Sequence, residues 1–179
     1  ANWSTKEFNQ QIDSPVQNSV LASGDFYKME VKESGIFKLD KNYLQSNSIN
    51  INNIDPRTIK IYGNGGAELP YNNSVVSPTD LVENKIYIEG EGDGRFDNND
   101  YILFYGRSPN EWVYDNNLKT YGHHLNNYSK SNYYWITFGG SNGQRIETVN
   151  SPNQPGLNPV VSFKDRFFEE PEVNNLGST

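Results

Sequence analysis

KIYIEGEGDGRFDNNDYILFYG, residues 85–106, carries the clearest structural pattern in the chain. Residues 85–89 alternate between polar and apolar side chains, and residues 101–105 are apolar or aromatic throughout, which is typical of strands. The segment between them is acidic and rich in glycine, as expected of a loop. The pattern predicts a strand, a loop and a second strand. The strongest strands must line the core, so we expect five of their side chains to be buried: Tyr87, Ile102, Phe104, Tyr134 and Ile136.

Further strand patterns precede this unit. Tyr27 to Val31 alternates, a turn follows at residues 33–35, and Ile36 to Leu39 runs back, which predicts a β-hairpin. Residues 58–62 predict another strand.

The pattern continues downstream. Residues 133–138 form the best candidate for a core strand, and we expect them to pair with residues 144–149. Residues 112–115 predict an edge strand, followed by a long polar loop to about residue 131. Residues 160–168 predict the last strand.

Helices are expected to be few and short. Asp40 is a suitable N-cap for one or two helical turns over residues 41–45, and Thr79-Asp80 could cap a turn through Leu81 and Val82. The chain has 26 Asn and three Ala residues, which favours turns over helices. We predict an all-β, antiparallel sandwich or barrel with jelly-roll-like or Greek-key-like connections and one or two short helices. The helix content should be under about 15% of residues.

The 179 residues fit one β-rich domain with two flanking segments. We expect an N-terminal arm over residues 1–18, a β-sandwich domain over residues 19–149, and a Pro-rich loop with the last strand over residues 150–179.

Composition excludes several classes of function. A net charge of −7 would repel a phosphate backbone, so we expect no nucleic-acid partner. No apolar run approaches the ~20 residues of a membrane helix, so we expect no membrane insertion. The chain has no cysteine, which removes thiolate catalysis, disulfides and cysteine-type zinc sites.

The acidic loop is the strongest candidate for an ion site. Residues 89–100 contain five carboxylates, and Asp93, Asp97 and Asp100 could converge on Ca²⁺, which prefers oxygen ligands. The EF-hand order of ligands is absent. The alternative is a hairpin loop whose Asp and Asn side chains cap their own backbone.

Other motifs carry weaker signals. Gly63-Asn64-Gly65-Gly66 lacks a phosphate-loop ending and favours a β-turn. His123 and His124 are neighbours in a polar loop and have no recognisable nucleophile, so no catalytic residue is assigned. A set of aromatic residues could form a sugar-binding platform or belong to the core: Trp112, Tyr114, Tyr121, Tyr128, Tyr133 and Trp135.

The order of the segments resembles a known family. Residues 25–39, the stretch IYGNGG at residues 61–66 with Leu69-Pro70, and the stretch DGRFDNNDYILFYG at residues 93–106 resemble the N-terminal, non-catalytic region of PorU-type proteins. These are gingipain-like cysteine peptidases that act as the sortase of the type IX secretion system in Bacteroidetes. Phe167-Phe168 and Asn175-Leu176 resemble the stretch that leads into the peptidase domain.

The resemblance implies a fragment without active-site residues, because the family's catalytic Cys and His lie in the downstream domain. The full protein would remove C-terminal secretion signals and attach cargo at the bacterial surface. The implied partners of this chain are the downstream catalytic domain, other type IX secretion components and secreted cargo. The implied location is exported, at the cell surface or outer membrane.

The sequence leaves alternatives open. The chain could instead be a stand-alone cell-surface module that binds carbohydrate or calcium. A hydrolase is the weakest interpretation, because no pair of a nucleophile and a base is visible.

Overall fold

The computed structural model describes residues 19–66, 68–72, 74–75, 77–150 and 161–162. These residues divide into two compact units: residues 19–111 with 125–146, and residues 112–124 with 147–150 and 161–162. The predicted arm over residues 1–18 lies outside the described residues, as does almost all of the predicted last strand. The division into an arm, a sandwich and a C-terminal segment therefore stays a prediction.

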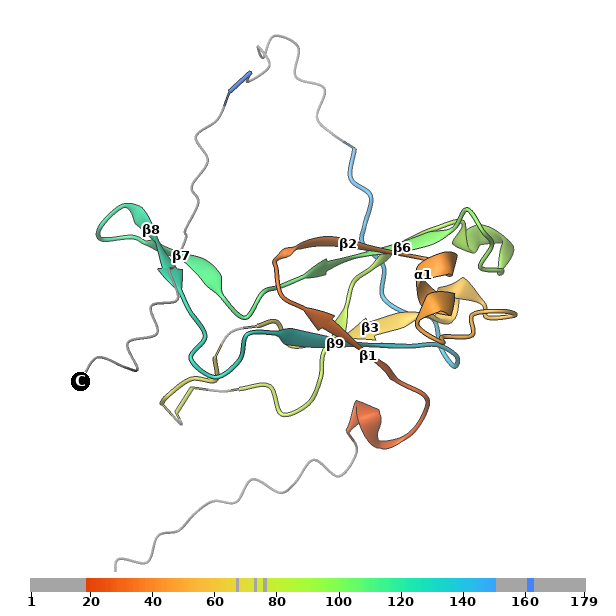
Figure 1. Ribbon diagram of the computed structural model, residues 1–179, viewed down its shortest axis with the longest axis horizontal. Helices are drawn as coiled ribbons and strands as arrows, with labels where there is room; N and C mark the ends of the chain where they lie inside the picture. The colour runs from red at the N-terminus through yellow and green to blue at the C-terminus, as the bar shows by residue number, and fades with distance from the viewer. Residues whose placement is uncertain (1–18, 67, 73, 76, 151–160, 163–179) are drawn as a thin grey trace, which may run out of the picture. The chain divides into compact units, whose positions relative to one another are not determined.

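The first unit contains two antiparallel sheets (Figure 1). One has the order β1-β9-β3-β4, and its strands are Tyr27–Val31, Asn132–Thr137, Lys60–Tyr62 and Glu83–Asn84. The other has the order β2-β6-β5, and its strands are Gly35–Asp40, Tyr101–Gly106 and Tyr87–Glu89. Neither sheet of the described chain closes into a barrel, so the predicted all-β, antiparallel class is confirmed in its sandwich-like form.

The predicted hairpin over residues 27–39 is wrong. β1 pairs with β9, whereas β2 pairs with β6, so the chain crosses from one sheet to the other between Val31 and Gly35. A Cβ atom on Gly106 would lie 2.8 Å from the Phe37 ring and 3.2 Å from a Val31 methyl group. β1 and β2 therefore contact each other through side chains in the core and not through backbone hydrogen bonds. Burying the apolar faces of both strands lowers the free energy more than a local hairpin would.

The core lies between the two sheets. It combines Met29, Val31, Ile61 and Ile136 of one sheet with Leu39, Ile88, Ile102 and Phe104 of the other. The rings of Phe104 and Tyr134 lie 5.3 Å apart and join the layers. Four of the five predicted core residues are therefore confirmed: Ile102, Phe104, Tyr134 and Ile136.

Tyr87 is the exception. It is 37% exposed, whereas Ile86 and Ile88 are buried. Strand residues alternate between faces, so a strand that buries Ile86 and Ile88 must turn Tyr87 outward. The register agrees, because Ile88 lies opposite the buried Ile102 and Tyr87 lies opposite Leu103.

Short helical elements connect the strands. α1, Lys41–Ser46, begins as predicted at Asp40, whose carboxylate accepts a hydrogen bond from the Tyr43 N–H at 2.8 Å. Three 3₁₀ turns follow the chain order: η1, Val20–Ala22; η2, Pro56–Thr58; and η3, Glu91–Asp93. α1 is the one α-helix in the described part of the chain, in line with the expected low helix content.

Two local predictions are wrong. No helical turn follows Asp80; residues 83–84 form β4 instead. Residues 144–149 do not pair with β9, because β9 already has β1 and β3 as neighbours. Arg145 instead forms an isolated parallel bridge with Ile86.

The second unit contains a two-stranded sheet of β7, Glu111–Asp115, and β8, Thr120–His124. The edge strand predicted at residues 112–115 is confirmed, but the long loop predicted to follow it contains β8. Glycine and histidine are weak strand formers, which explains why Thr120 to His124 gave no strand pattern. No helix within the described residues is long and apolar enough to cross a membrane.

Candidate functional site

The acidic loop connects β5 to β6. Its backbone turns at Gly90 and Gly94, both with positive φ (88° and 76°), on either side of η3. Asp93 accepts a hydrogen bond from the Arg95 N–H at 2.9 Å. Asp100 is buried and accepts one from the Asp97 N–H at 2.7 Å. Two of the three predicted ligands therefore cap nearby backbone groups.

These contacts match the self-capping alternative stated for this loop. Within the described residues, no group of three or more His, Asp or Glu side chains is placed to hold a metal ion. Calcium binding by Asp93, Asp97 and Asp100 stays a prediction.

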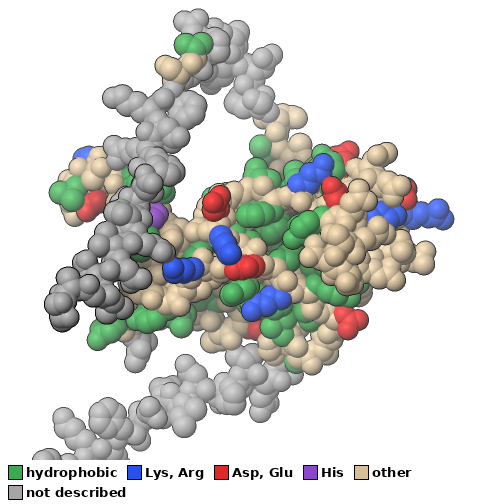
Figure 2. Space-filling view, viewed as in Figure 1, with side chains coloured by type: hydrophobic (Ala, Val, Ile, Leu, Met, Phe, Trp, Pro, Cys, Tyr) green, Lys and Arg blue, Asp and Glu red, His purple; other side chains and the backbone are tan. Residues whose placement is uncertain are grey.

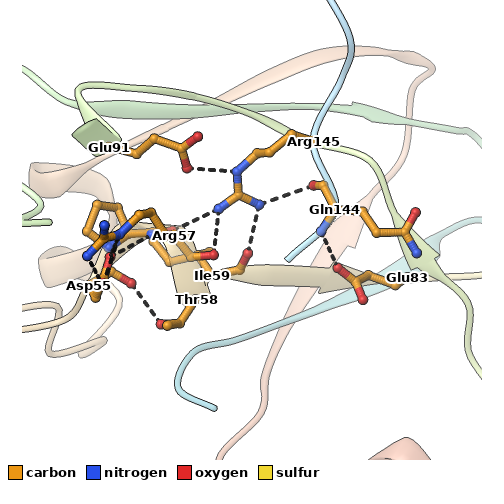
Figure 3. A network of polar contacts seen from close by, with 9 residues as sticks. Asp55, Arg57, Thr58, Ile59, Glu83, Glu91, Gln144 and Arg145 are labelled. Carbon is orange, nitrogen blue, oxygen red and sulfur yellow. Dashed lines mark hydrogen bonds and ion pairs between the residues drawn. The ribbon is translucent and has the colours of Figure 1, made fainter. Parts of the chain in front are cut away.

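Arg145 makes the densest set of polar contacts in this region (Figure 3). Its Nε donates to Glu91 at 2.8 Å, and its Nη2 donates to the carbonyl oxygens of Pro56 and Arg57 at 3.0 and 2.9 Å. Nη1 donates to the carbonyl oxygens of Ile59 and Gln144. The guanidinium thus fastens the segment after β9 to η2 and η3, and its donors are used for structure.

Asp55 and Arg57 form a neighbouring exposed pair, also drawn in Figure 3. Arg57 Nη2 lies 2.6 Å from Asp55 Oδ2. The hydrogen bonds from Arg57 hold the pKa of the Asp55 carboxyl below its ordinary value of 3.8. A carboxylate held in its charged form by an adjacent guanidinium is a poor general acid or base near neutral pH.

The β7–β8 hairpin gathers aromatic side chains. The rings of Trp112 and His123 lie 5.0 Å apart, and those of Tyr114 and Tyr121 lie 4.9 Å apart. Trp112, Tyr114 and Tyr121 are 42%, 43% and 52% exposed. Trp112 and Tyr114 are two residues apart in a strand and so share a face. We call these four side chains the aromatic face of the hairpin.

Three of the six residues of the predicted aromatic platform lie on the hairpin: Trp112, Tyr114 and Tyr121. The other three lie in the first unit. Tyr128 lies in a loop of the other unit and is 87% exposed. Tyr133 and Trp135 are partly buried in β9, where the Lys28 ammonium sits 3.6 Å from the centre of the Tyr133 ring. His124 is an exposed neighbour of His123 in β8, and a strand directs adjacent side chains to opposite faces.

The glycine-rich stretch after β3 forms a turn, as predicted. Gly65 has φ of 82°. Asn64 donates through its side chain to the Asp80 carbonyl oxygen at 3.0 Å and accepts from the Val82 N–H at 2.9 Å. The turn is thus tied to the segment that precedes β4.

Two arginines were not among the residues predicted from the sequence. Arg145 and Arg107 each stand alone in the sequence, without a motif or a spacing that would single them out. The apolar pattern before Arg107 could have shown that it directly follows a core strand, β6. No such signal exists for Arg145.

The first unit is a two-sheet antiparallel β-module, and the chain cannot be a cysteine peptidase because it has no cysteine. No protein-family model matches the chain, and no curated protein sequence matches it either.

The crystal structure of dimeric latent PorU from Porphyromonas gingivalis is similar to this chain. The likeness has a TM-score of 0.54 and 26% sequence identity, and it covers 74% of this chain. It covers only 11% of the PorU chain. The comparison supports a PorU-related fold and is consistent with a non-catalytic region of such a protein.

Proposed function

We propose that this chain is a non-catalytic β-module of a larger, gingipain-like cysteine peptidase of the type IX secretion system. The observation that carries the proposal is the likeness to PorU, which extends over most of this chain but a small fraction of that one. The module acts by docking on the catalytic part of the same polypeptide or on secretion partners. Removal of C-terminal signals and attachment of cargo belong to the full protein, which is exported to the cell surface.

The lack of cysteine supports a non-catalytic role, in which the module acts through its contact with the catalytic domain. A cysteine peptidase needs a thiolate and a base within hydrogen-bonding reach, and this chain supplies no thiol. Domains of one chain commonly bury roughly 600–1,500 Å² against each other. Such an interface can orient a catalytic domain or shield its cleft.

The aromatic face of the hairpin supports docking as well. A two-stranded hairpin is at best marginally stable alone in water. Trp112, Tyr114 and Tyr121 are each at least 42% exposed, and such residues are enriched at protein interfaces. We assign this face to the contact with the rest of the protein.

The test uses the full parent protein and a double variant, Trp112→Ala with Tyr121→Ala. We expect lower thermal stability and faster proteolysis between the module and the remainder. Tyr128→Ala is the matched control, because it removes an exposed aromatic ring outside the hairpin. Unchanged proteolysis in the double variant would exclude the hairpin as the contact.

A second experiment tests the module as a whole. Calorimetry should detect binding between this chain and a separately expressed catalytic remainder. If no binding is seen, and deletion of the module leaves folding and activity of the parent intact, the docking function fails.

The alternative is a stand-alone carbohydrate-binding module, which the same exposed aromatic residues favour because sugars stack on aromatic rings. Binding to a panel of glycans that is lost in the double variant and kept in Tyr128→Ala would support it. An open reading frame that ends near residue 179 would add to that support.

A further inference from the structure

A cavity of about 360 Å³ opens between the β3–β4 connection and the end of β6, within the first unit. The chemistry of its lining comes from Tyr134, Arg107 and Lys85, and its apolar wall comes from Val82, Pro78 and Tyr105.

Tyr134 is the buried part of this lining. It is 1% exposed, and its ring packs directly on the backbone of Gly63, where a Cβ atom would lie 2.5 Å from the ring. The hydroxyl oxygen accepts a hydrogen bond from the Arg107 N–H at 2.9 Å. Within the described residues the hydroxyl proton has no acceptor, so one buried donor is left for a ligand.

Arg107 adds a charged donor. Its side chain lies over Gly65, with Cδ 3.6 Å from the position a Cβ atom would take there. No hydrogen bond or ion pair of its guanidinium is found among the described residues. Arg107 is exposed, so its guanidinium can meet a ligand that enters from solvent.

The cavity is therefore positive in an acidic protein. Arg107 and Lys85 line it, and no Asp or Glu is among the described lining residues. The amide groups of Asn64 and Asn84, which also line it, already bond to the backbone. Lys85 also has a partner, so the donors left for a ligand are the Arg107 guanidinium and the Tyr134 hydroxyl.

We propose that this cavity binds a carboxylate attached to a small apolar or aromatic group. The planar guanidinium matches a carboxylate through two parallel hydrogen bonds. The Tyr134 hydroxyl supplies a further donor, and the apolar wall accommodates the carbon part of the ligand. The carboxylate could belong to a free acid, a chain end or an acidic side chain. This assignment does not depend on the function proposed above.

The first test is a titration of the full, ¹⁵N-labelled chain with benzoate, followed by nuclear magnetic resonance. Benzoate should shift the amide signals of Gly65 and Arg107 in a saturable way, whereas benzamide, its neutral analogue, should not. Equal shifts from both compounds, or no shift with millimolar benzoate, would overturn the proposal. Tighter binding of inorganic phosphate than of benzoate would overturn the choice of carboxylate.

Arg107→Gln tests the charged donor. The dissociation constant for benzoate should rise about tenfold or more, because hydrogen bonds to charged groups are the stronger ones. Folding should be little affected, since the guanidinium makes no hydrogen bond or ion pair within the described residues, and a urea melt checks this. Arg95→Gln is the matched control, an exposed arginine outside the cavity. Unchanged affinity in Arg107→Gln would contradict the assignment.

Three short peptides of one sequence distinguish the possible sources of the carboxylate: a free acid, a chain end or an acidic side chain. One has a free C-terminus, one an amidated C-terminus, and one an amidated C-terminus with an internal glutamate. Binding of the first alone indicates a chain end, and binding of the third indicates an acidic side chain. If benzoate binds and no peptide does, the site accepts free acids.

Discussion

Asp80 shows how one side chain joins distant parts of the chain. Its carboxylate accepts hydrogen bonds from the Ser19 hydroxyl at 2.9 Å and from the Val20 and Leu81 N–H groups at 2.8 Å each. Asp80 therefore binds the N-cap residue Ser19 and the first residue of η1, some sixty positions earlier, and caps no helical turn just after it. The three donors lower the pKa of the Asp80 carboxyl below its ordinary value of 3.8.

The first prediction concerns acid stability. Because the folded-state pKa of Asp80 is depressed, its contribution to stability is present above pH 3.8 and is lost as the pH falls through the folded value. The stability difference between the wild type and Asp80→Asn should therefore be constant near neutral pH and shrink below pH 3.8. Urea melts across this range measure it.

Asp25→Asn serves as the control, because Asp25 is exposed and makes no hydrogen bond to a described residue. A difference between the wild type and Asp80→Asn that is the same in acid and at neutral pH would contradict the prediction.

Arg145 gives the second prediction. Its five hydrogen bonds hold the segment after β9 to η2 and η3, and its side chain is only 22% exposed. Arg145→Gln should lower the free energy of unfolding by about 1.5–3 kcal/mol, the range for hydrogen bonds to charged groups. Arg95→Gln should change it by no more than about 0.5 kcal/mol. Equal stability of the two variants would show that the Arg145 contacts are not needed.

Among the elements, β6 is central. It lies between β2 and β5, and it buries Ile102 and Phe104 while Tyr105 points outward and is 54% exposed. Phe104 packs on Phe37 of its own sheet and on Tyr134 of the other, with ring centres 5.4 and 5.3 Å apart. The strand thus links the two layers.

The third prediction follows from this packing. Phe104→Ala should cost about 3–5 kcal/mol of stability, the range for a buried aromatic ring that leaves a cavity. Ile36→Thr, on the neighbouring strand β2, is the control, because Ile36 is 74% exposed and threonine keeps the β-branch. Denaturant melts compare them. A loss below about 1 kcal/mol for Phe104→Ala would mean that the sheets do not pack as described.

The loop between β5 and β6 carries the fourth prediction. If Ca²⁺ binds through Asp93, Asp97 and Asp100, the melting temperature rises with calcium concentration, because a ligand of the native state stabilises it. Asp97→Asn should reduce this rise, and magnesium should not reproduce it. Melts that coincide in millimolar calcium and in chelator would reject a site and leave the self-capping loop.

The net charge of the whole molecule limits which partners it can bind. On the face shown in Figure 2, charged side chains of both signs are scattered among hydrophobic ones. On this face no large area of one sign is seen that could attract a polyanion. The expectation that nucleic acid is not a partner rests on the net charge of −7.

The absence of cysteine leads to the fifth prediction. The chain alone should not cleave peptide substrates, and thiol-reactive peptidase inhibitors should not label it, because it contains no thiol. Fluorogenic peptides and an iodoacetamide probe make the measurement, with the full parent protein as the positive control. Turnover by the purified chain would show that a different, cysteine-independent site exists.

The class of fold and several local features could be predicted from the sequence alone. Alternation and β-propensity identified β5, β6 and β9, and the Asp40 side chain marked the start of α1. These features depend on a few neighbouring residues, so they can be predicted without knowledge of the rest of the chain. The lack of cysteine likewise needed no structure.

Only the tertiary structure decided which strands pair and which side chains meet. β1 and β2 are neighbours in sequence but lie in different sheets, and Tyr87 faces outward because Ile86 and Ile88 fill the core. Arg145, Arg107 and Tyr134 acquire their contacts from segments tens of residues away. Strand pairing and burial depend on which apolar faces of strands can be buried together. The free energy of this burial has contributions from residues that are far apart in the sequence. A local pattern therefore states that a strand forms but not what lies beside it.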